Sequence, residues 1–199
     1  TGQTDGTIIA MPGARELLAQ IQQGREAIPG GAQAGQLSQA VRFARACKVH
    51  VRSPLGFSLN KYRVVLTEPY YLLATSAYAQ KAFQASDVSP PPDTFITSDV
   101  CTQGKPDPEP YRKGAELSRA DISKCIVVED APPGVLSGKR AGARVLGLRT
   151  THDGQRMWDQ GADWVVPDLS YVKAEWQGDR LLLTIDSEQV PAHVAPPSS

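Results

Sequence analysis

Two short stretches of this chain contain the charged residues best suited to chemistry. Lys105 lies in a turn fixed by Gly104 and Pro106, immediately before a predicted helix. Glu129 and Asp130 follow a near-continuous apolar run that is typical of a buried parallel strand. A lysine held at the carboxyl end of a sheet can neutralise a phosphate or a phosphorylated carboxylate. Paired carboxylates at a strand end are oxygen ligands suited to Mg²⁺, which also binds waters and substrate phosphate.

Each stretch also has a purely structural interpretation. A lone lysine in a proline-rich turn is usually surface charge, and an acidic pair after a strand often caps a helix. Asp130 begins a loop that leads to a helix N-terminus, where the helix dipole favours anions. The chain between Lys105 and Glu129 has room for one helix and one strand, so both stretches are expected at the same sheet edge.

From about residue 78 onward, the strands and helices that must position these residues are expected to alternate along the chain. Short apolar runs and helix-period segments follow one another, which predicts a doubly wound α/β domain with a Rossmann-like parallel sheet. We expect strands at 94–97, 124–129, 143–148 and 162–166, and helices at 78–85, 108–118 and 132–141, with Gly142 as a helix cap. Runs at 172–176 and 180–185 flank Gln177-Gly178-Asp179 and predict a closing antiparallel hairpin.

The N-terminal part of the chain is less regular. Residues 12–23 form an amphipathic pattern with Leu17, Leu18 and Ile21 on one face, and Gly24 is expected to end this helix. Strand-like runs follow at 62–67 and 70–75, but much of the segment between the helix and these runs shows no sustained period.

These patterns predict four consecutive regions. The expected organisation is a degenerate N-terminal motif, helix and loop at 1–34, an insert of uncertain structure at 35–68, an α/β core at 69–186 and a disordered tail at 187–199.

Composition excludes several classes of protein. The 199 residues carry 21 Lys and Arg against 21 Asp and Glu, so there is no electrostatic case for binding nucleic acid or a membrane surface. No apolar run reaches the roughly 18 residues of a membrane span, and no signal peptide opens the chain. Three cysteines without CxxC spacing suit a reducing compartment, and we expect a cytoplasmic protein. No GxGxxG follows any expected strand, which disfavours an NAD-binding domain.

A series of motifs resembles the haloacid dehalogenase superfamily of phosphatases, and most closely the fungal-type glycerol-phosphate and 2-deoxyglucose-6-phosphate phosphatases. The similarity covers about residues 78–176 together with 12–33. The motifs, in family order, are Phe95-Ile-Thr-Ser-Asp99, Gly104-Lys-Pro-Asp-Pro-Glu-Pro-Tyr-Arg-Lys-Gly114, Val127-Val-Glu-Asp-Ala-Pro-Pro-Gly134, Gly138-Lys-Arg-Ala-Gly142 and Gly147-Leu-Arg-Thr-Thr-His152.

The resemblance implies Mg²⁺-dependent hydrolysis of a small phosphomonoester such as a sugar or polyol phosphate. It implies that Lys105 steadies a phospho-aspartate and that Glu129 and Asp130 are the acidic pair around Mg²⁺. It also implies a strand end whose hydroxyl and amide hold the phosphoryl group, for which Thr75 and Ser76 are the candidates. A small phosphorylated metabolite is the expected partner.

The sequence departs from the family at its N-terminus. The family's Asp-x-Asp-Gly-Thr loop supplies a nucleophile and a general acid/base, but the candidate here is Gln3-Thr-Asp-Gly-Thr7. Gln3 would replace the nucleophile, Asp5 would be the acid/base residue, and the helical cap is missing or incomplete. An Asp-Gly pair is also an ordinary turn signal. We therefore expect little turnover from this sequence, and the alternative is a catalytically inactive or truncated relative.

The remaining histidines and tryptophans have structural interpretations. His50, His152 and His193 share no spacing with other metal-ligating residues and are interpreted as surface or loop residues. The three tryptophans, Trp158, Trp164 and Trp176, are expected to be packing residues.

Overall fold

The described part of the chain alternates between strands and helices. The computed structural model describes residues 12–26, 48–51, 72–73, 96–97, 100–117, 120–177 and 180–188. The elements are α1 (Ala14–Glu26), β1 (Lys48–Val51), β2 (Leu72–Leu73), β3 (Ile96–Thr97), α4 (Glu109–Leu117), the 3₁₀ helix η3 (Ile122–Lys124), β4 (Ile126–Glu129), α5 (Pro132–Ala141), β5 (Arg144–Leu148), α6 (Gly154–Asp159), β6 (Trp164–Val166), the 3₁₀ helix η4 (Leu169–Tyr171), β7 (Val172–Gln177) and β8 (Arg180–Ile185). Their order is that of an α/β fold, as the sequence predicts.

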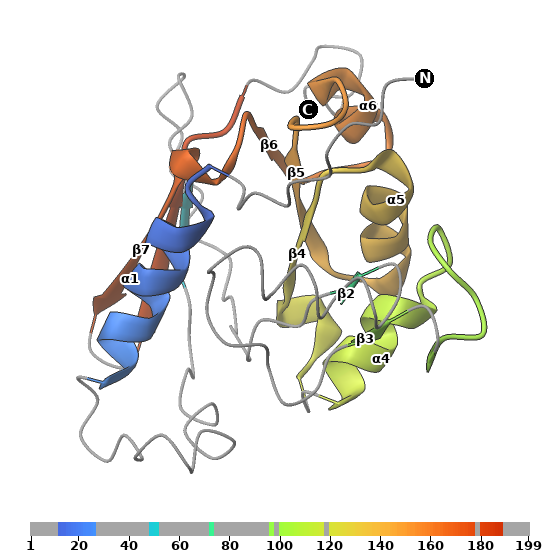
Figure 1. The fold of residues 1–199 in the computed structure, drawn as a ribbon, viewed down its shortest axis with the longest axis horizontal. Helices are drawn as coiled ribbons and strands as arrows, with labels where there is room; N and C mark the ends of the chain where they lie inside the picture. The colour runs from blue at the N-terminus through green and yellow to red at the C-terminus, as the bar shows by residue number, and fades with distance from the viewer. Residues whose placement is uncertain are drawn as a thin grey trace, which may run out of the picture.

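The described strands form three sheets, whereas the sequence predicts one parallel sheet with a hairpin. β4, β5 and β6 are parallel neighbours in that order, and β2 pairs with β3 in parallel. β8 lies between β1, which is parallel to it, and β7, which is antiparallel to it (Figure 1). β1 lies within 35–68, in the part that precedes the strand-like run at 62–67 and shows no sustained period. A four-residue strand is too short to display a period.

One face of the β4–β5–β6 sheet packs against helices. α5 and α6 lie along the same side of these strands, and α4 lies beside α5 (Figure 1). The buried residues of this layer are Val127, Val135, Ala143, Val145, Met157, Trp158, Ala162 and Val165. α5 approaches the strands closely, because a Cβ at Gly138 would lie 2.9 Å from Val145. Small residues on α5 therefore set its distance from the sheet.

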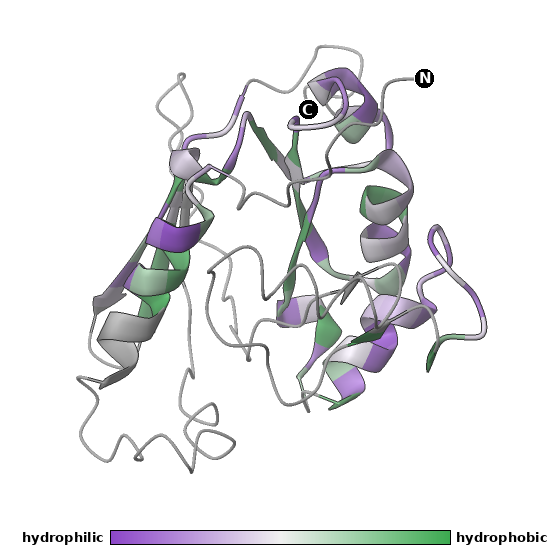
Figure 2. Ribbon diagram, in the orientation of Figure 1, coloured by the Kyte–Doolittle hydropathy of each residue, from purple (hydrophilic) through white to green (hydrophobic). Residues whose placement is uncertain are grey.

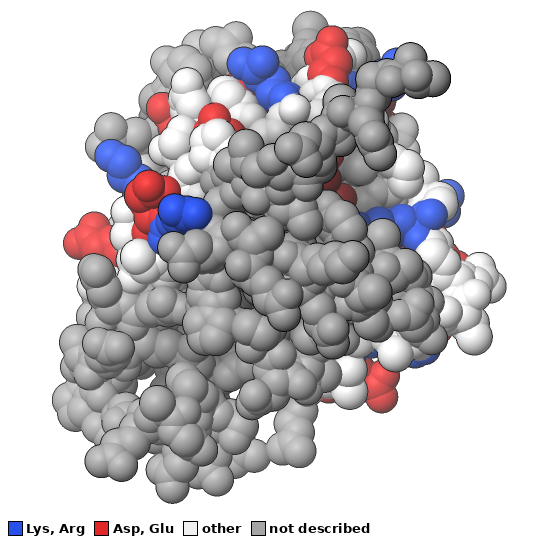
Figure 3. Space-filling model, in the orientation of Figure 1, with Lys and Arg blue, Asp and Glu red and all other residues white. Residues whose placement is uncertain are grey.

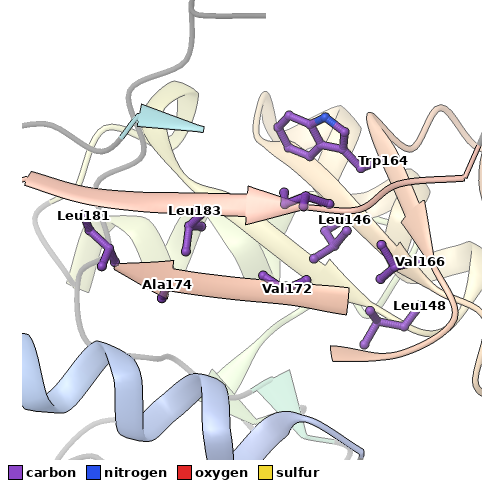
Figure 4. Packing of buried hydrophobic residues seen from close by; sticks show 9 residues of the cluster. Leu146, Leu148, Trp164, Val166, Val172, Ala174, Leu181 and Leu183 are labelled. Carbon is purple, nitrogen blue, oxygen red and sulfur yellow. The ribbon is translucent and has the colours of Figure 1, made fainter. Parts of the chain in front are cut away.

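The opposite face of the sheet packs against β7 and β8. Figure 4 shows leucine and valine side chains from both sheets meeting between the strands, and they form one buried cluster. Its members are Leu146, Leu148, Trp164, Val166, Val172, Ala174, Leu181, Leu183 and Ile185. Buried and exposed residues alternate along β7, as expected for a strand with one solvated face. Figure 2 shows the corresponding hydrophobic colouring along β5 and β6.

The helix α1 packs along β7 (Figure 1). Leu17 and Ile21 pack against the cluster, in agreement with the predicted apolar face. The helix continues to Glu26, so the predicted stop at Gly24 is wrong. Tertiary hydrogen bonds hold the helix on the strand, because Trp176 Nε1 donates to the carbonyl of Ile21 across 2.9 Å. Glycine favours the end of a helix, but tertiary contacts such as this hydrogen bond can outweigh that tendency.

Other predicted elements agree with the structure. α5 has the predicted bounds, and Gly142 caps it with a φ of 98°. Trp158 and Trp164 are buried, which confirms their packing role. No helix in the described ranges is long and apolar enough to cross a membrane.

The chain after β8 belongs to the folded part. Ser187 is only 8% exposed, its hydroxyl accepts a hydrogen bond from Val165 N across 3.1 Å, and Glu188 N donates to Val165 O across 2.8 Å. These bonds cover the outer edge of β6. The predicted tail beginning at residue 187 is therefore wrong for its first two residues.

Charged residues on the described surface are mixed in sign. Over α1 and β7, Figure 3 shows basic and acidic side chains lying side by side. This local mixture matches the equal numbers of acidic and basic residues in the whole sequence.

Asp163 joins the start of β6 to β5 and α5. Its carboxylate lies 2.8 Å from Lys139 Nζ and 2.6 Å from an Arg144 guanidinium nitrogen, and it accepts Val145 N across 2.8 Å. The carboxylate side chain is 11% exposed, whereas both cationic side chains are about one-third exposed. Asp163 is thus a mostly buried hydrogen-bond acceptor whose donors, Lys139 and Arg144, are partly solvated.

We expect Asp163→Asn to lower the free energy of unfolding by about 1–2 kcal/mol, because it removes the charge from three hydrogen bonds. Urea unfolding followed by circular dichroism measures this change. Asp186→Asn, at an exposed aspartate, is the matched control and should be near neutral. Equal effects of the two substitutions would contradict the anchoring role.

Candidate functional site

The candidate site forms at the carboxyl end of β4. Glu129 is the last residue of this strand and is 7% exposed, while Asp130 follows it and is half-buried. Glu129 shares the α5 side of the sheet with Val127, because alternate residues of a strand face the same side. A buried carboxylate at a strand end requires partners that offset its loss of hydration.

Two residues supply those partners. Lys105 Nζ forms an ion pair with Glu129 Oε1, and the Tyr111 hydroxyl donates a hydrogen bond to the same oxygen. Lys105 Nζ also lies 5.5 Å from the centre of the Tyr111 ring. Burial, followed by the charge of Glu129, raises the pKa of Tyr111 far above its usual value. Tyr111 is therefore a neutral phenol and a permanent donor.

The second oxygen of Glu129 faces the first turn of α5. A Cβ at Gly134 would lie 2.0 Å from Glu129 Oε2, so only a glycine allows the helix to sit this close to the carboxylate. In the sequence, Gly134 stands out only as part of a motif. The physical requirement for glycine there comes from the neighbouring chain segment, which cannot be recognised from local sequence.

α5 also fixes the turn that carries Lys105. The buried Ser137 hydroxyl donates to Asp107 O across 2.5 Å, and an Arg140 guanidinium nitrogen donates to Pro106 O across 3.2 Å. Within the turn, Asp107 N donates to Gly104 O across 3.0 Å. The backbone on the C-terminal side of Lys105 is thus attached to the helix that contacts Glu129.

Glu109 organises the segment before Lys105. Its carboxylate accepts the Thr102 hydroxyl across 2.7 Å and Gln103 N across 2.7 Å, and it lies 2.7 Å from Lys113 Nζ. The hydrogen bond from Lys113, then those from Thr102 and Gln103, lower the pKa of Glu109 to about 2. Because the folded pKa is depressed, this stabilisation is present above the ordinary value of 4.5 and is lost as pH falls toward 2.

Asp130 is linked to the loop after β5. The Thr151 hydroxyl donates to Asp130 O across 2.7 Å, and His152 Nδ1 lies 3.1 Å from the same carbonyl. A carbonyl oxygen only accepts, which assigns the proton in that contact to Nδ1. From the sequence, His152 is expected to be an ordinary loop residue, and its contact with Asp130 is not predicted. The contact arises because β4 and β5 are neighbours and end at the same edge.

The two carboxylates differ in their fitness for a metal ion. Glu129 Oε1 already accepts Lys105 and Tyr111, and Oε2 packs against Gly134, so Glu129 has little capacity for another ligand. Asp130 is half-buried, and within the described part of the chain only one long contact of 3.4 Å, from the Thr151 hydroxyl, reaches its carboxylate. In the described ranges no three acidic, His or Cys residues group as a metal site. Mg²⁺ binds through one or two carboxylates with waters and phosphate, so Asp130 alone fits such an ion.

The other predicted site residues lie outside the described part of the chain. These are Asp5, Thr75 and Ser76, together with Gln3 at the expected nucleophile position. The nearest described element to Thr75 is β2, which ends at Leu73. The structure therefore brings together Lys105 and Glu129, with Asp130 next in the chain, and leaves the other assignments as predictions.

Part of the chain is similar to a known protein family. The family model described as haloacid dehalogenase-like hydrolase matches residues 58–142, which include Lys105, Glu129 and Asp130. Residues 58–142 are therefore similar to haloacid dehalogenase-like hydrolases. The match confirms the resemblance that the motifs indicate.

Curated relatives agree with this match. The chain is 40% identical over 96 residues to validoxylamine A 7'-phosphate phosphatase of Streptomyces hygroscopicus subsp. limoneus, covering 48% of this chain and 44% of the relative. It is 41% identical over 88 residues to 2-deoxyglucose-6-phosphate phosphatase 2 of Saccharomyces cerevisiae, covering 41% and 36%. It is 38% identical over 118 residues to glycerol-1-phosphate phosphohydrolase 2 of the same yeast, covering 54% and 47%. The chain thus spans less than half the length of these relatives.

A solved structure supports the fold. The putative beta-phosphoglucomutase from Thermotoga maritima superposes with a TM-score of 0.51 at 21% identity, covering 79% of this chain and 56% of that one. The chain therefore has an α/β fold with a parallel sheet, as predicted.

We expect Gly134→Ala to destabilise the protein by about 1–3 kcal/mol, because the new methyl group must displace the Glu129 carboxylate. Helix propensity alone predicts the opposite sign, since alanine is the better helix former. Thermal unfolding measures the effect. Gly104→Ala is the matched control, because a Cβ there meets nothing within 4 Å. A stabilised Gly134→Ala variant would contradict the close packing around Glu129.

Proposed function

We propose that this haloacid dehalogenase-like chain carries the phosphate-neutralising part of a Mg²⁺-dependent phosphomonoester hydrolase. The observation that carries the proposal is the ion pair between Lys105 and Glu129 at the end of β4. It fixes a cation at the edge of a parallel sheet, where ligands of α/β proteins commonly bind.

Lys105 is the proposed phosphate ligand. Its side chain is 27% exposed, while its partner Glu129 is 6% exposed, so the ammonium lies between a buried carboxylate and solvent. An ammonium has three N–H donors, and the hydrogen bond to Glu129 uses one of them. Among the described residues no second acceptor is bonded to Lys105 Nζ, so the remaining donors can meet phosphoryl oxygens, whose negative charge rises as the ester bond breaks.

Asp130 is the proposed residue for Mg²⁺. When bound, the ion would supply positive charge that stabilises the phosphoryl oxygens. Thr151 and His152 hold the backbone carbonyl of Asp130, which restricts the position of its carboxylate. In this proposal Glu129 serves as the counter-charge of Lys105, although the family resemblance assigns both acidic residues to the metal.

The proposed substrate class is a small phosphorylated sugar or polyol. Three kinds of relative support it, because their names specify phosphatases of 2-deoxyglucose 6-phosphate, glycerol 1-phosphate and hexitol phosphate. The substrate is a proposal for this chain, since the matched region covers less than half of each relative.

A second candidate function is binding of a phosphorylated molecule without turnover. Gln3 is the observation that favours it, because an amide oxygen is a poor nucleophile and brings no charge to a metal. This candidate keeps the roles of Lys105 and Asp130 and removes only the covalent step.

We expect Lys105→Ala to weaken binding of inorganic phosphate at least tenfold, because one charge-assisted contact is lost. Calorimetric titration measures this binding, and Lys173→Ala, at an exposed lysine of β7, is the control. The double variant Lys105→Gln/Glu129→Gln removes both charges and separates phosphate binding from the cost of an unpaired buried carboxylate.

The same samples distinguish the two candidate functions. Mg²⁺-dependent turnover of glycerol 1-phosphate or 2-deoxyglucose 6-phosphate that requires Lys105 supports the hydrolase. Phosphate binding that requires Lys105 without turnover supports the second candidate. Binding that is unchanged in Lys105→Ala would overturn both.

We expect weak Mg²⁺ binding that disappears in Asp130→Asn, because one charged ligand gives low affinity and the substitution removes the proposed carboxylate ligand. The rise in unfolding temperature on adding Mg²⁺ measures the interaction. Asp186→Asn should retain the rise. A rise that survives in Asp130→Asn would place the ion elsewhere.

A further inference from the structure

Tyr111 occupies the centre of the site, although its sequence context indicates only a packing residue on α4. Its ring packs against the buried layer between α5, α6 and the sheet. Its hydroxyl reaches Glu129 Oε1, the oxygen that also binds Lys105. A phenylalanine would fill the same apolar space, so packing does not account for the hydroxyl.

The hydroxyl completes the coordination of a buried carboxylate. Glu129 Oε1 receives both Tyr111 and Lys105, and Oε2 lies against the backbone of Gly134. Because the Glu129 side chain is almost fully buried, it depends on such donors in place of water. A carboxylate with a fixed donor on one side and a helix on the other has little freedom to rotate.

Tyr111 also contacts Lys105 directly. The ammonium nitrogen lies 5.5 Å from the ring centre, within the distance at which a cation interacts with an aromatic face. Lys105 is thus held by the carboxylate that the hydroxyl fixes and by the ring itself. Both interactions come from one side chain.

We propose that Tyr111 is a positioning residue for Lys105, acting through the carboxylate of Glu129. The proposal rests on the proposed role of Lys105 as phosphate ligand. Without the hydroxyl, Glu129 keeps its charge but loses the donor that fixes its orientation. The ammonium then follows a mobile carboxylate, and its remaining donors are no longer directed toward one position.

The first test is a spectroscopic signature of the Lys105 ammonium in the full 199-residue chain. Lysine-selective ¹H–¹⁵N spectra detect ammonium groups whose protons exchange slowly with water, and Lys105→Arg assigns the signal. We expect Tyr111→Phe to speed this exchange about tenfold. The substitution removes the hydrogen bond from Tyr111 to the Glu129 carboxylate, which then holds the Lys105 ammonium less firmly. The ring is retained, so the effect reports on the hydroxyl.

The same spectrum contains its own control. Lys139 pairs with Asp163 across 2.8 Å at the far end of α5, and its ammonium should be unchanged in Tyr111→Phe. A Lys105 signal that exchanges equally slowly in wild type and Tyr111→Phe would overturn the proposal. A purely structural role of Tyr111 would instead alter both lysine signals together.

The second test is a double-mutant cycle on binding of inorganic phosphate. We expect Tyr111→Phe to weaken binding about tenfold in the wild-type background and to have little effect in the Glu129→Gln background. Equal effects in both backgrounds would show that Tyr111 does not act through Glu129.

The two tests separate this proposal from the proposed function. Absence of phosphate binding by the wild-type chain would overturn the role of Lys105 as phosphate ligand. In that case the ammonium spectra still decide whether Tyr111 positions Lys105, because they require no ligand.

Discussion

The arrangement of the site depends on burial of one carboxylate, that of Glu129. An ionised carboxylate loses its hydration at the end of β4, and this cost must be met by donors brought from elsewhere in the chain. Lys105 comes from the turn before α4, Tyr111 comes from α4, and Gly134 lets α5 approach. A single charge therefore fixes the relative positions of one strand, two helices and one turn.

The β4–β5–β6 sheet provides the rigid support for this charge. β5 is covered by α5 and α6 on one face and by β7 and β8 on the other, so every residue from Val145 to Leu148 is buried. Such two-sided burial explains the continuous apolar run of β5, whereas Val128 of β4 is 45% exposed on the face away from α5. Asp163 and Ser187 add to this support by accepting hydrogen bonds from backbone N–H groups of β5 and β6.

The two adjacent acidic residues take different environments because they lie on either side of the strand end. Glu129 is the last paired residue of β4 and points toward α5, where it is enclosed. Asp130 has left the strand, and its backbone is held by the loop after β5. One carboxylate therefore acts as a fixed counter-charge, and the other keeps capacity for an additional ligand. This difference in burial is the reason for the proposed roles, in which Glu129 positions Lys105 and Asp130 binds the metal ion.

The sequence alone determined the order of elements, the buried strands, the bounds of α5 with its glycine cap, and the motifs that resemble the haloacid dehalogenase family. These features depend on local periodicity, on turn chemistry and on residues close together in the chain. Tertiary structure decided that α1 continues past Gly24, that β1 pairs with β8, and that Ser187 belongs to the fold. It also decided that Tyr111 and Gly134 enclose Glu129 and that His152 reaches Asp130. Each of these depends on contact between segments distant in sequence, because burial of a polar group selects its partners by position in space rather than by position along the chain.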